Sequence, residues 1–295
     1  AKGGHALVHA HFGTGAVYAL PYVRKHRLPF IVTFHGNDVA ALIGPQRFRP
    51  ARWRYVLRAK KIMQRADLML AVSTEFCDIL SSLSGRPDAV KLYRIGVDLA
   101  RFHRSETRSS IPEIIMVGRF TEKKGHIYAL RAFTHVIRKG RTAHLTLVGD
   151  GALEDECRNY VAREDLSERV TFAGSLPPER TAEMLGAADI ALAPSVVARN
   201  GDREGSPIVV REAGACEVPV IGTRHSGIPE SIEDGVTGYL VRERDATALA
   251  DKLQCLIDDA DLRRRMGVAA RAKMEREFDL FKQVEILESH YDSVR

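Results

Sequence analysis

The chain has 295 residues, of which 45% are hydrophobic and 28% charged, and it contains no low-complexity segment. This composition excludes a fibrous or disordered protein, and the length allows two domains that each bury a core. No uninterrupted apolar run reaches the length of a membrane span and no secretory signal is recognisable, so we expect a soluble or peripheral protein. The cysteines are scattered without a C-x-x-C pair, which predicts reduced thiols in the cytoplasm and neither zinc nor disulfides; they are Cys77, Cys157, Cys216 and Cys255.

The net charge of +6 is unevenly distributed. Residues 1–110 carry 18 Lys and Arg against 7 Asp and Glu, whereas residues 111–295 carry 26 against 31. A basic first half indicates an anionic partner. We expect a phosphorylated lipid acceptor or a membrane surface in preference to nucleic acid.

Short apolar runs alternate with amphipathic stretches in the first half, the pattern of parallel α/β units. The chain opens on Ala1–Gly4 without a methionine and passes at once into a strand-like run, so we expect an upstream part of the first domain to be missing. Strands are expected at 6–9, 30–34, 68–72 and 90–95, and helices near 15–26, 51–65 and 74–84. A polar segment at 102–112 interrupts this pattern and is predicted to be the interdomain linker.

The same rhythm restarts in the second half. Strands are expected at 114–117, 144–148, 170–173, 190–193, 218–221 and 238–241, with helices between them and helices from 245 onward. No repeat of 20–50 residues is present, which excludes a solenoid. We predict two Rossmann-like, doubly wound α/β domains facing each other across a cleft: residues 1–105, 106–278, and a last helix in 279–295 that is a candidate to cross back to the first domain.

The first motif that carries chemistry is the run Val117–Gly125. A strand is expected to end at Gly118 and a helix to begin around Lys124, so Arg119 and Lys124 lie on a loop at the carboxyl end of a strand, where open α/β sheets bind ligands. Two cations at this position suit a diphosphate. Taken alone, the run would more often be an ordinary solvated basic loop.

The second motif runs from Glu204 to Glu212. Ser206 is a good N-cap and Pro207 suits the first helical position, so a helix start is expected whose free N–H groups attract an anion. Two carboxylates on either side of a phosphate-binding helix start are suited to the hydroxyls of a sugar at one end and of a ribose at the other. A bare pair of glutamates eight residues apart occurs often by chance, and the Gly-Ser-Pro inset makes this one specific.

Polar residues also follow an apolar strand in Thr33–Asp38. This position marks a ligand-facing edge, although a single histidine such as His35 is more often structural. His9 and His11 lie on one side of the preceding strand because side chains alternate along a strand. Without a third ligand, we interpret them as packing or supporting groups and not as metal ligands.

Two further strand-to-helix turns occur in the second half, Gly174–Pro177 and Ser226–Glu230. The first could offer backbone groups to a base and the second could help close the cleft. Asp259 and Asp261 form an Asp-x-Asp pattern in the helical tail, which we interpret as a coincidence and not as a metal site.

A basic helix is expected at 51–65. Arg54, Arg58, Lys61 and Arg65 are spaced so that they share one face, whereas Trp53, Val56, Leu57 and Met63 fall mostly on another. Such a helix suits an anionic headgroup surface that holds a lipid-linked acceptor. An ordinary surface helix that packs its apolar side inward explains the pattern equally well.

Together these residues resemble glycosyltransferase family 4, whose members have the GT-B fold. The runs Val117–Gly125, Glu204–Glu212 and Ser226–Glu230 occur in that family's order and spacing. The neighbourhood of residues 193–205, with Thr33–Asp38 upstream, is most similar to transferases that assemble colanic acid and amylovoran. The resemblance spans the chain from His5 to its end.

The resemblance implies roles for individual residues. Arg119 and Lys124 would bind the donor diphosphate and stabilise the leaving nucleotide, Glu204 and His35 would contact the donor sugar, and Glu212 would bind the ribose. The other candidate donor-binding residues are Asp38, Leu176, Gly205, Ser206, Pro207 and Ile208.

The resemblance also implies an activity. A hexose would move with retention from a UDP-sugar to a lipid-linked or saccharide acceptor in bacterial exopolysaccharide synthesis, at the inner face of the cell membrane, without a metal or other cofactor. Members of the family begin with a strand and a glycine-rich loop that faces the donor phosphates and the acceptor, and neither is visible ahead of Ala1. If both are absent, we expect the chain to bind nucleotide without turning it over.

Three alternatives stay open. A nicotinamide-dependent oxidoreductase would need a third glycine after Gly13-Thr14-Gly15 or Gly149-Asp150-Gly151, and neither run has one. A nucleotide-sugar epimerase would share the fold. A non-catalytic subunit that binds nucleotide-sugar is the third possibility.

Overall fold

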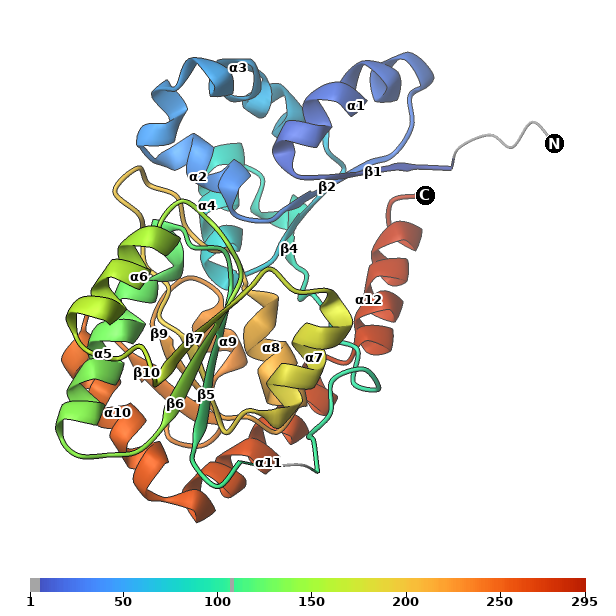
Figure 1. Ribbon diagram of the computed structural model, residues 1–295. Coiled ribbons are helices and arrows are strands. Elements are labelled where there is room, and N and C mark those ends of the chain that lie inside the picture. Colours follow the sequence, from blue (N-terminus) through green and yellow to red (C-terminus); the bar gives the residue numbers. More distant parts are fainter. Residues whose placement is uncertain (1–5, 107–108) are drawn as a thin grey trace. The chain divides into compact units, whose positions relative to one another are not determined.

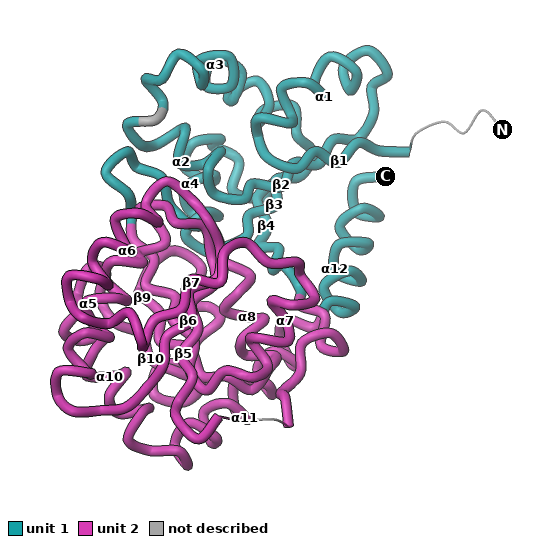
Figure 2. The backbone as a smooth tube through the Cα atoms, viewed as in Figure 1, with its two compact units in different colours: residues 1–96, 197–206, 280–295 teal, residues 97–196, 207–279 magenta. Residues whose placement is uncertain are grey.

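A computed structural model describes residues 6–106 and 109–295, so the opening Ala1–Gly4 and Thr107 and Arg108 of the expected linker lie outside it. Contacts divide the chain into two compact units (Figure 2). Unit 1 contains Ala1–Gly96, Val197–Ser206 and Leu280–Arg295, and unit 2 contains Val97–Val196 and Pro207–Asp279. The division falls ahead of the expected linker because Val97 and Phe102 are buried with Phe278 in the core of unit 2.

Unit 1 is built on a four-stranded parallel sheet in the order β1-β2-β3-β4 (Figure 1). Its strands are β1 (Val8–His11), β2 (Phe30–Phe34), β3 (Leu68–Ala71) and β4 (Val90–Leu92). Every residue of β2 and β3 is buried. Such continuous apolar runs are typical of strands covered on both faces.

Helices cover both faces of this sheet. They are α1 (Gly13–His26), α2 (Asn37–Ile43), α3 (Pro50–Arg65), α4 (Thr74–Ser84) and α12 (Leu280–Asp292), with short 3₁₀ turns at Pro45–Phe48 and Pro87–Ala89. Phe30, Val32 and Phe34 join one apolar cluster with residues of α1, α3 and α4. Ile31 faces the opposite side and packs with Leu287 and other residues of the C-terminal segment. Alternation along the strand therefore places α12 on its own face of the sheet.

Unit 2 contains a six-stranded parallel sheet in the order β10-β9-β8-β5-β6-β7. Its strands are β5 (Glu113–Val117), β6 (His144–Val148), β7 (Val170–Gly174), β8 (Ile190–Ala193), β9 (Val220–Thr223) and β10 (Gly238–Val241). The chain builds outward from β5 in one direction and then, from β8, in the other. This is the doubly wound topology that the alternating pattern predicted.

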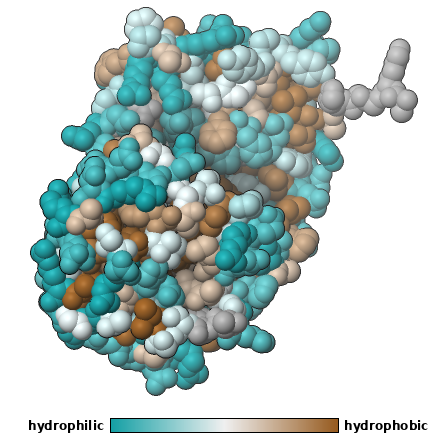
Figure 3. All heavy atoms as spheres, in the orientation of Figure 1, coloured by the Kyte–Doolittle hydropathy of each residue, from teal (hydrophilic) through white to brown (hydrophobic). Residues whose placement is uncertain are grey.

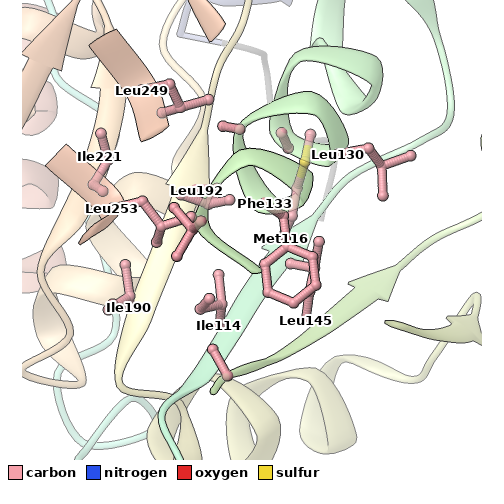
Figure 4. Packing of buried hydrophobic residues seen from close by; sticks show 14 of the residues in the cluster. Ile114, Met116, Leu130, Phe133, Leu145, Ile190, Leu192, Ile221, Leu249 and Leu253 are labelled. Atoms are coloured by element: carbon pink, nitrogen blue, oxygen red, sulfur yellow. The ribbon is translucent and has the colours of Figure 1, made fainter. Parts of the chain in front are cut away.

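The helices of unit 2 bury both faces of that sheet. They are α5 (His126–Arg138), α6 (Glu154–Arg163), α7 (Pro178–Ala187), α8 (Ile208–Ala215), α9 (Ile228–Ser231), α10 (Ala246–Asp258) and α11 (Ala260–Glu277), with a 3₁₀ turn at Glu122–Lys124. Phe133 of α5, Leu253 of α10 and Ile114 of β5 meet in the larger cluster (Figure 4). Among the described residues, no helix is both long and apolar enough to cross a bilayer.

The core of unit 2 yields a stability prediction. Phe133 is fully buried, so Phe133→Ala should lower the free energy of unfolding by about 3–5 kcal/mol through lost burial and a cavity. Val268 is 52% exposed, and Val268→Ala should change it by less than about 0.5 kcal/mol. Urea denaturation of both variants measures the difference, and equal midpoints would contradict this assignment of the core.

Candidate functional site

The strand order of unit 2 reverses between β5 and β8, which are hydrogen-bonded neighbours. Crevices for ligands form at the carboxyl ends of strands at such a switch point. The loop after β5 begins at Gly118 and the loop after β8 at Pro194. They are joined at this edge, because the Val196 N–H donates to the Lys123 carbonyl at 2.9 Å and a Cβ on Gly125 would collide with the Pro194 carbonyl oxygen.

The two predicted diphosphate ligands lie on the loop after β5. Arg119 is exposed, and Lys124 is half-buried at the end of the 3₁₀ turn. The aliphatic stem of Lys124 lies over Gly118, since a Cβ there would come within 3.1 Å of Lys124 Cδ. The expected helix begins at His126, after the 3₁₀ turn and not at Lys124.

Gly149 and Gly151 have a role that sequence reasoning missed. A Cβ on Gly149 would collide with the Gly118 carbonyl oxygen, and one on Gly151 would approach the Phe120 carbonyl oxygen to 2.7 Å. The Phe120 N–H also donates to the Asp150 carbonyl at 2.7 Å. The two glycines therefore let the loop after β6 pack directly against the cationic loop, which a search for a dinucleotide motif could not reveal.

Helix α8 begins one residue later than predicted. Pro207 occupies the N-cap with extended backbone (φ −65°, ψ 117°), and Ile208 is the first helical residue. The prediction that Ser206 caps this helix was therefore wrong: Ser206 belongs to unit 1, whereas Pro207 and the helix belong to unit 2.

Glu212 lies in α8 and is partly buried. Burial raises the pKa of its carboxyl, and the nearby charges of Arg101 and Lys124 oppose that rise. The structure thus couples Glu212 electrostatically to Lys124 of the predicted set. It adds Arg101, which also pairs with Glu179 at 3.1 Å, and which no motif marked because it lies far from Glu212 in the sequence.

Other turns of unit 2 have identifiable structural tasks. Leu176 is half-buried against the apolar cluster that contains Val210. The Asp259 carboxylate accepts the Leu262 N–H at 2.8 Å and caps α11, a structural task for the first residue of the Asp-x-Asp pattern. Over residues 6–106 and 109–295, no group of three or more His, Cys, Asp or Glu side chains is arranged to hold a metal ion.

In unit 1, His35 and two other histidines gather at the carboxyl ends of β1 and β2. His9 Nδ1 is 2.8 Å from the Tyr291 hydroxyl and its Nε2 is 2.7 Å from the Thr33 hydroxyl. His11 Nδ1 is 3.0 Å from His35 Nε2, a hydrogen bond that requires one of these two nitrogens to carry a proton and the other to accept it. His11 therefore restricts the orientation and tautomer of His35.

Burial lowers the pKa values of two of these histidines. The pKa of His9 falls to about 4, through burial first and then the proximity of His11 and His35. The pKa of His35 is also lowered by burial, an effect that Asp38 opposes and His11 reinforces. His35 is therefore neutral near pH 7 and able to donate one hydrogen bond and accept another.

Asp38 organises the loops around His35. Its side chain is 1% exposed. Oδ2 accepts the Gly13 N–H at 2.8 Å, and Oδ1 accepts the N–H groups of His35, Gly36 and Val39 at 3.1, 2.9 and 3.0 Å. These contacts give the carboxylate a task in shaping the loops that follow β1 and β2, distinct from the direct donor contact predicted for it.

Glu204 and Gly205 also belong to unit 1. A Cβ on Gly205 would collide with the His35 carbonyl oxygen, and one on Gly36 would lie 3.0 Å from the Gly205 nitrogen. The backbone on both sides of Glu204 thus lies against the His35–Gly36 peptide. Of the predicted set, unit 1 brings together His35, Asp38 and the segment with Glu204.

Helix α3 turns only part of its predicted apolar face inward, since Met63 is buried but Trp53 and Leu57 are not. Its buried residues are Tyr55, Ala59, Ile62 and Met63. Trp53 and Leu57 were expected on an apolar face apart from the cations, but they are 55% and 78% exposed and lie among them. The reason is Tyr55, whose ring fills the space beside Gly13 and so sets the rotation of the helix.

The four predicted basic residues of α3 differ in their surroundings. Arg54, Arg58 and Lys61 are exposed and line a shallow pocket with Arg24. Arg65 instead donates to the Leu28 carbonyl at 2.6 Å and pairs with an Asp67 oxygen at 3.0 Å. Arg65 therefore fixes the end of α3 to the start of β2.

Two α/β units, each built on a parallel sheet, define the GT-B class of fold. The doubly wound order predicted for both units is present in the sheet of unit 2, whereas the described strands of unit 1 follow one another in sequence order. Similar solved structures include Anabaena HepE in complex with UDP-glucose, with a TM-score of 0.83, 21% identity and coverage of 98% of this chain and 79% of that one. Sucrose-phosphate synthase from Thermosynechococcus elongatus has a TM-score of 0.83, 23% identity and coverage of 99% and 74%.

The chain belongs to the group 1 glycosyl transferases, whose family model matches residues 101–273, and the model of glycosyltransferase family 4 matches residues 1–101. It is 34% identical to the putative colanic acid biosynthesis glycosyltransferase WcaL of Salmonella typhimurium over 92% of this chain and 66% of the relative. It is 33% identical to the amylovoran biosynthesis glycosyltransferase AmsK of Erwinia amylovora over 84% and 60%. The chain thus spans about 60–66% of the length of these relatives.

The loop that carries Lys124 is supported by His126, which predicts a pH dependence of stability. Burial lowers the pKa of His126 to about 3, and its ring stacks on Phe120 with centroids 4.1 Å apart. Because the unfolded chain binds the proton near pH 6.5 and the folded chain does not, stability falls as the pH drops through 6.5 toward 3. The contribution lost between pH 7 and 5 should be about 2 kcal/mol.

Denaturant titrations at pH 7 and pH 5 test this. His126→Phe keeps the stacked ring and should reduce the difference in the free energy of unfolding between pH 7 and pH 5 by that amount. His135→Gln, at an exposed position of the same helix, is the control and should leave the difference unchanged. An undiminished pH dependence in His126→Phe would contradict the assignment.

Proposed function

We propose that this chain is the larger part of a retaining glycosyltransferase that moves a hexose from a UDP-sugar to a lipid-linked or saccharide acceptor in bacterial exopolysaccharide assembly. The reaction breaks the bond between the anomeric carbon and a phosphate oxygen and forms one to an acceptor oxygen. The observation that carries the proposal is the cationic loop of Arg119 and Lys124 at the switch point of unit 2, where the charge of Lys124 acts on the Glu212 carboxyl.

The phosphate end of the donor is assigned to unit 2. Charge develops on the leaving diphosphate as the glycosidic bond breaks, and fixed cations stabilise it most where water is excluded. Lys124 has its stem held over Gly118, so its ammonium group is restrained before the donor binds. The first N–H groups of α8 would add an anion-binding element. Glu212 would accept hydrogen bonds from the ribose hydroxyls.

The sugar end is assigned to unit 1. A neutral His35, restrained by His11, suits a sugar hydroxyl because it can donate or accept without bringing a charge. Glu204 would accept from another hydroxyl. The relatives support the proposed activity, since HepE has been solved with UDP-glucose, and WcaL and AmsK are named for colanic acid and amylovoran biosynthesis.

The cations would replace a metal ion at the diphosphate, and the reaction would therefore proceed in excess chelator. A panel of nucleotide-sugars, with EDTA present, can be assayed for release of free nucleotide with and without lipid or saccharide acceptors. UDP release from a UDP-sugar, and an α-anomeric product from an α-linked donor, is the expected result. Binding without release would favour a non-catalytic subunit, and conversion to an isomeric nucleotide-sugar would favour an epimerase.

Lys124 gives the sharpest test of the phosphate assignment. Lys124→Ala should lower turnover about 10²–10³-fold, because it removes one restrained charge partner of the leaving group. Lys123→Ala in the same 3₁₀ turn is the control, since Lys123 holds the loop after β8 through its backbone carbonyl. Steady-state kinetics measure both, and turnover of Lys124→Ala within a few-fold of wild type would refute the assignment.

We further propose that unit 1 docks on an anionic membrane through α1 and α3. Single apolar residues are common on protein surfaces, and the face in Figure 3 mixes hydrophilic with hydrophobic residues. Helix α3 differs because exposed Trp53 and Leu57 lie among exposed cations, and Tyr18 of α1 is 70% exposed beneath the Arg54 guanidinium. Aromatic and basic side chains in such a mixture favour a headgroup interface.

Vesicle co-sedimentation tests the membrane proposal. Changing Arg54, Arg58 and Lys61 together to Gln should weaken binding to anionic vesicles strongly at low salt, since each cation contributes about 1 kcal/mol. Binding by wild type should fade at high salt. The control changes three exposed arginines of α11 to Gln, Arg264, Arg265 and Arg276, and should bind as wild type does. Equal loss of vesicle binding in both triple variants would show that net charge, and not the surface of α3, determines binding.

A further inference from the structure

Residues 197–206 leave unit 2 and pack on unit 1, although the residues before and after them belong to unit 2. The segment has an ordered interior. The Ala198 N–H donates to the Asp202 carbonyl at 2.9 Å, and the Gly201 N–H donates to the Ala198 carbonyl at 2.8 Å. The Asn200 side chain accepts the Asp202 N–H at 2.8 Å. Its shape is therefore held by its own hydrogen bonds.

Two close backbone contacts attach the segment to unit 1. Gly201 has a φ of +81° and lies against Gly44 and Pro45, with 3.4 Å between its hypothetical Cβ and Gly44 Cα. At the other end, Gly205 lies against the His35 carbonyl and the Val72 side chain, leaving no room for a Cβ. Glycine at each point lets the two backbones approach.

Between these two points, an ion pair joins the segment to α4. The Arg203 guanidinium donates to a Glu75 carboxylate oxygen. The Arg203 side chain is 19% exposed and that of Glu75 is 38% exposed, so the pair is partly sheltered from water. Glu75 lies in the first turn of α4, where the helix dipole favours a negative charge. Glu204 lies between the ion pair and the Gly205 contact.

We propose that residues 197–206 are a docked arm of unit 1, and that Arg203 and Glu75 are positioning residues that hold Glu204 beside the His35–Gly36 peptide. The two residues assigned to the donor sugar are then fixed to one another within unit 1, while Glu212 belongs to unit 2. This inference rests on the proposed function for its catalytic consequence but not for the docking itself.

Limited proteolysis tests the docking without any assay of activity. Arg199 and Arg203 are both trypsin sites in the docked arm. Glu75→Gln removes the partner of Arg203 but keeps both sites, and cleavage there should become about three- to tenfold faster as the arm opens more often. Asp78→Asn, an exposed position in the same helix, is the matched control and should be cleaved as wild type is. Equal rates for Glu75→Gln and Asp78→Asn would overturn the docking.

A second pair of variants tests the backbone contact. Gly205→Ala forces a Cβ against the His35 carbonyl and should speed cleavage at the same sites more than Glu75→Gln does. Gly15→Ala places a Cβ where no atom lies within 4 Å and should leave the rate unchanged. Unchanged cleavage of Gly205→Ala would also overturn the docking.

Kinetics test the positioning role. Glu75→Gln and Arg203→Gln should each lower donor turnover about tenfold and leave the UDP dissociation constant within about twofold, because the nucleotide is assigned to unit 2. Arg203→Lys keeps the charge and should recover most of the turnover. Parallel loss of UDP affinity, or no advantage of Arg203→Lys over Arg203→Gln, would overturn the positioning role. Absence of donor turnover in the full-length wild-type protein would overturn the proposed function, and the cleavage rates would still decide the docking.

Discussion

Unit 1 depends on one buried carboxylate. Four backbone N–H groups, from Gly13, His35, Gly36 and Val39, converge on Asp38. Charged acceptors form strong hydrogen bonds with backbone donors, and a buried carboxylate without them would be costly. The loops after β1 and β2 consequently have one arrangement. That arrangement sets the position of His35 relative to His11 and presents the peptide on which the 197–206 arm packs.

In unit 2, close backbone packing and not a carboxylate fixes the loops at the strand ends. Gly149 and Gly151 bring the loop after β6 against Gly118 and Phe120, and Gly125 brings the cationic loop against Pro194. Two loops, from the strands on either side of β5, thus support the loop that carries Lys124 before any ligand is present. Preorganised charge of this kind is what stabilisation of a leaving diphosphate requires, because the protein then has little reorganisation to complete during the reaction.

Much of this structure follows from sequence patterns. The strands and most helices were predicted because buried parallel strands are apolar runs and amphipathic helices follow them. The cationic loop and the Glu204–Glu212 block were selected as site candidates because chemistry in α/β folds collects at strand ends. These signals are local, since a strand and the loop that follows it are adjacent in the sequence.

The features that escaped prediction depend on contacts distant in sequence. Ser206 looked like a helix cap, but residues 197–206 pack on unit 1 and the helix starts after Pro207. Arg65 continued a basic stripe by spacing, yet its guanidinium bonds to the Leu28 carbonyl. Trp53 was expected on a face of α3 apart from the cations, yet the packing of Tyr55 sets the rotation of the helix and leaves Trp53 exposed among them. No periodicity encodes such choices, because tertiary packing decides them.

A crystal structure with bound UDP would test the central claim most directly, which is that the Gly118–Lys124 loop and Glu212 form the nucleotide diphosphate site. The account predicts phosphate oxygens within hydrogen-bonding distance of Arg119 and Lys124, and ribose hydroxyls at the Glu212 carboxylate. Diphosphate bound instead among Arg24, Arg54, Arg58 and Lys61 of unit 1, with the loop after β5 empty, would contradict it.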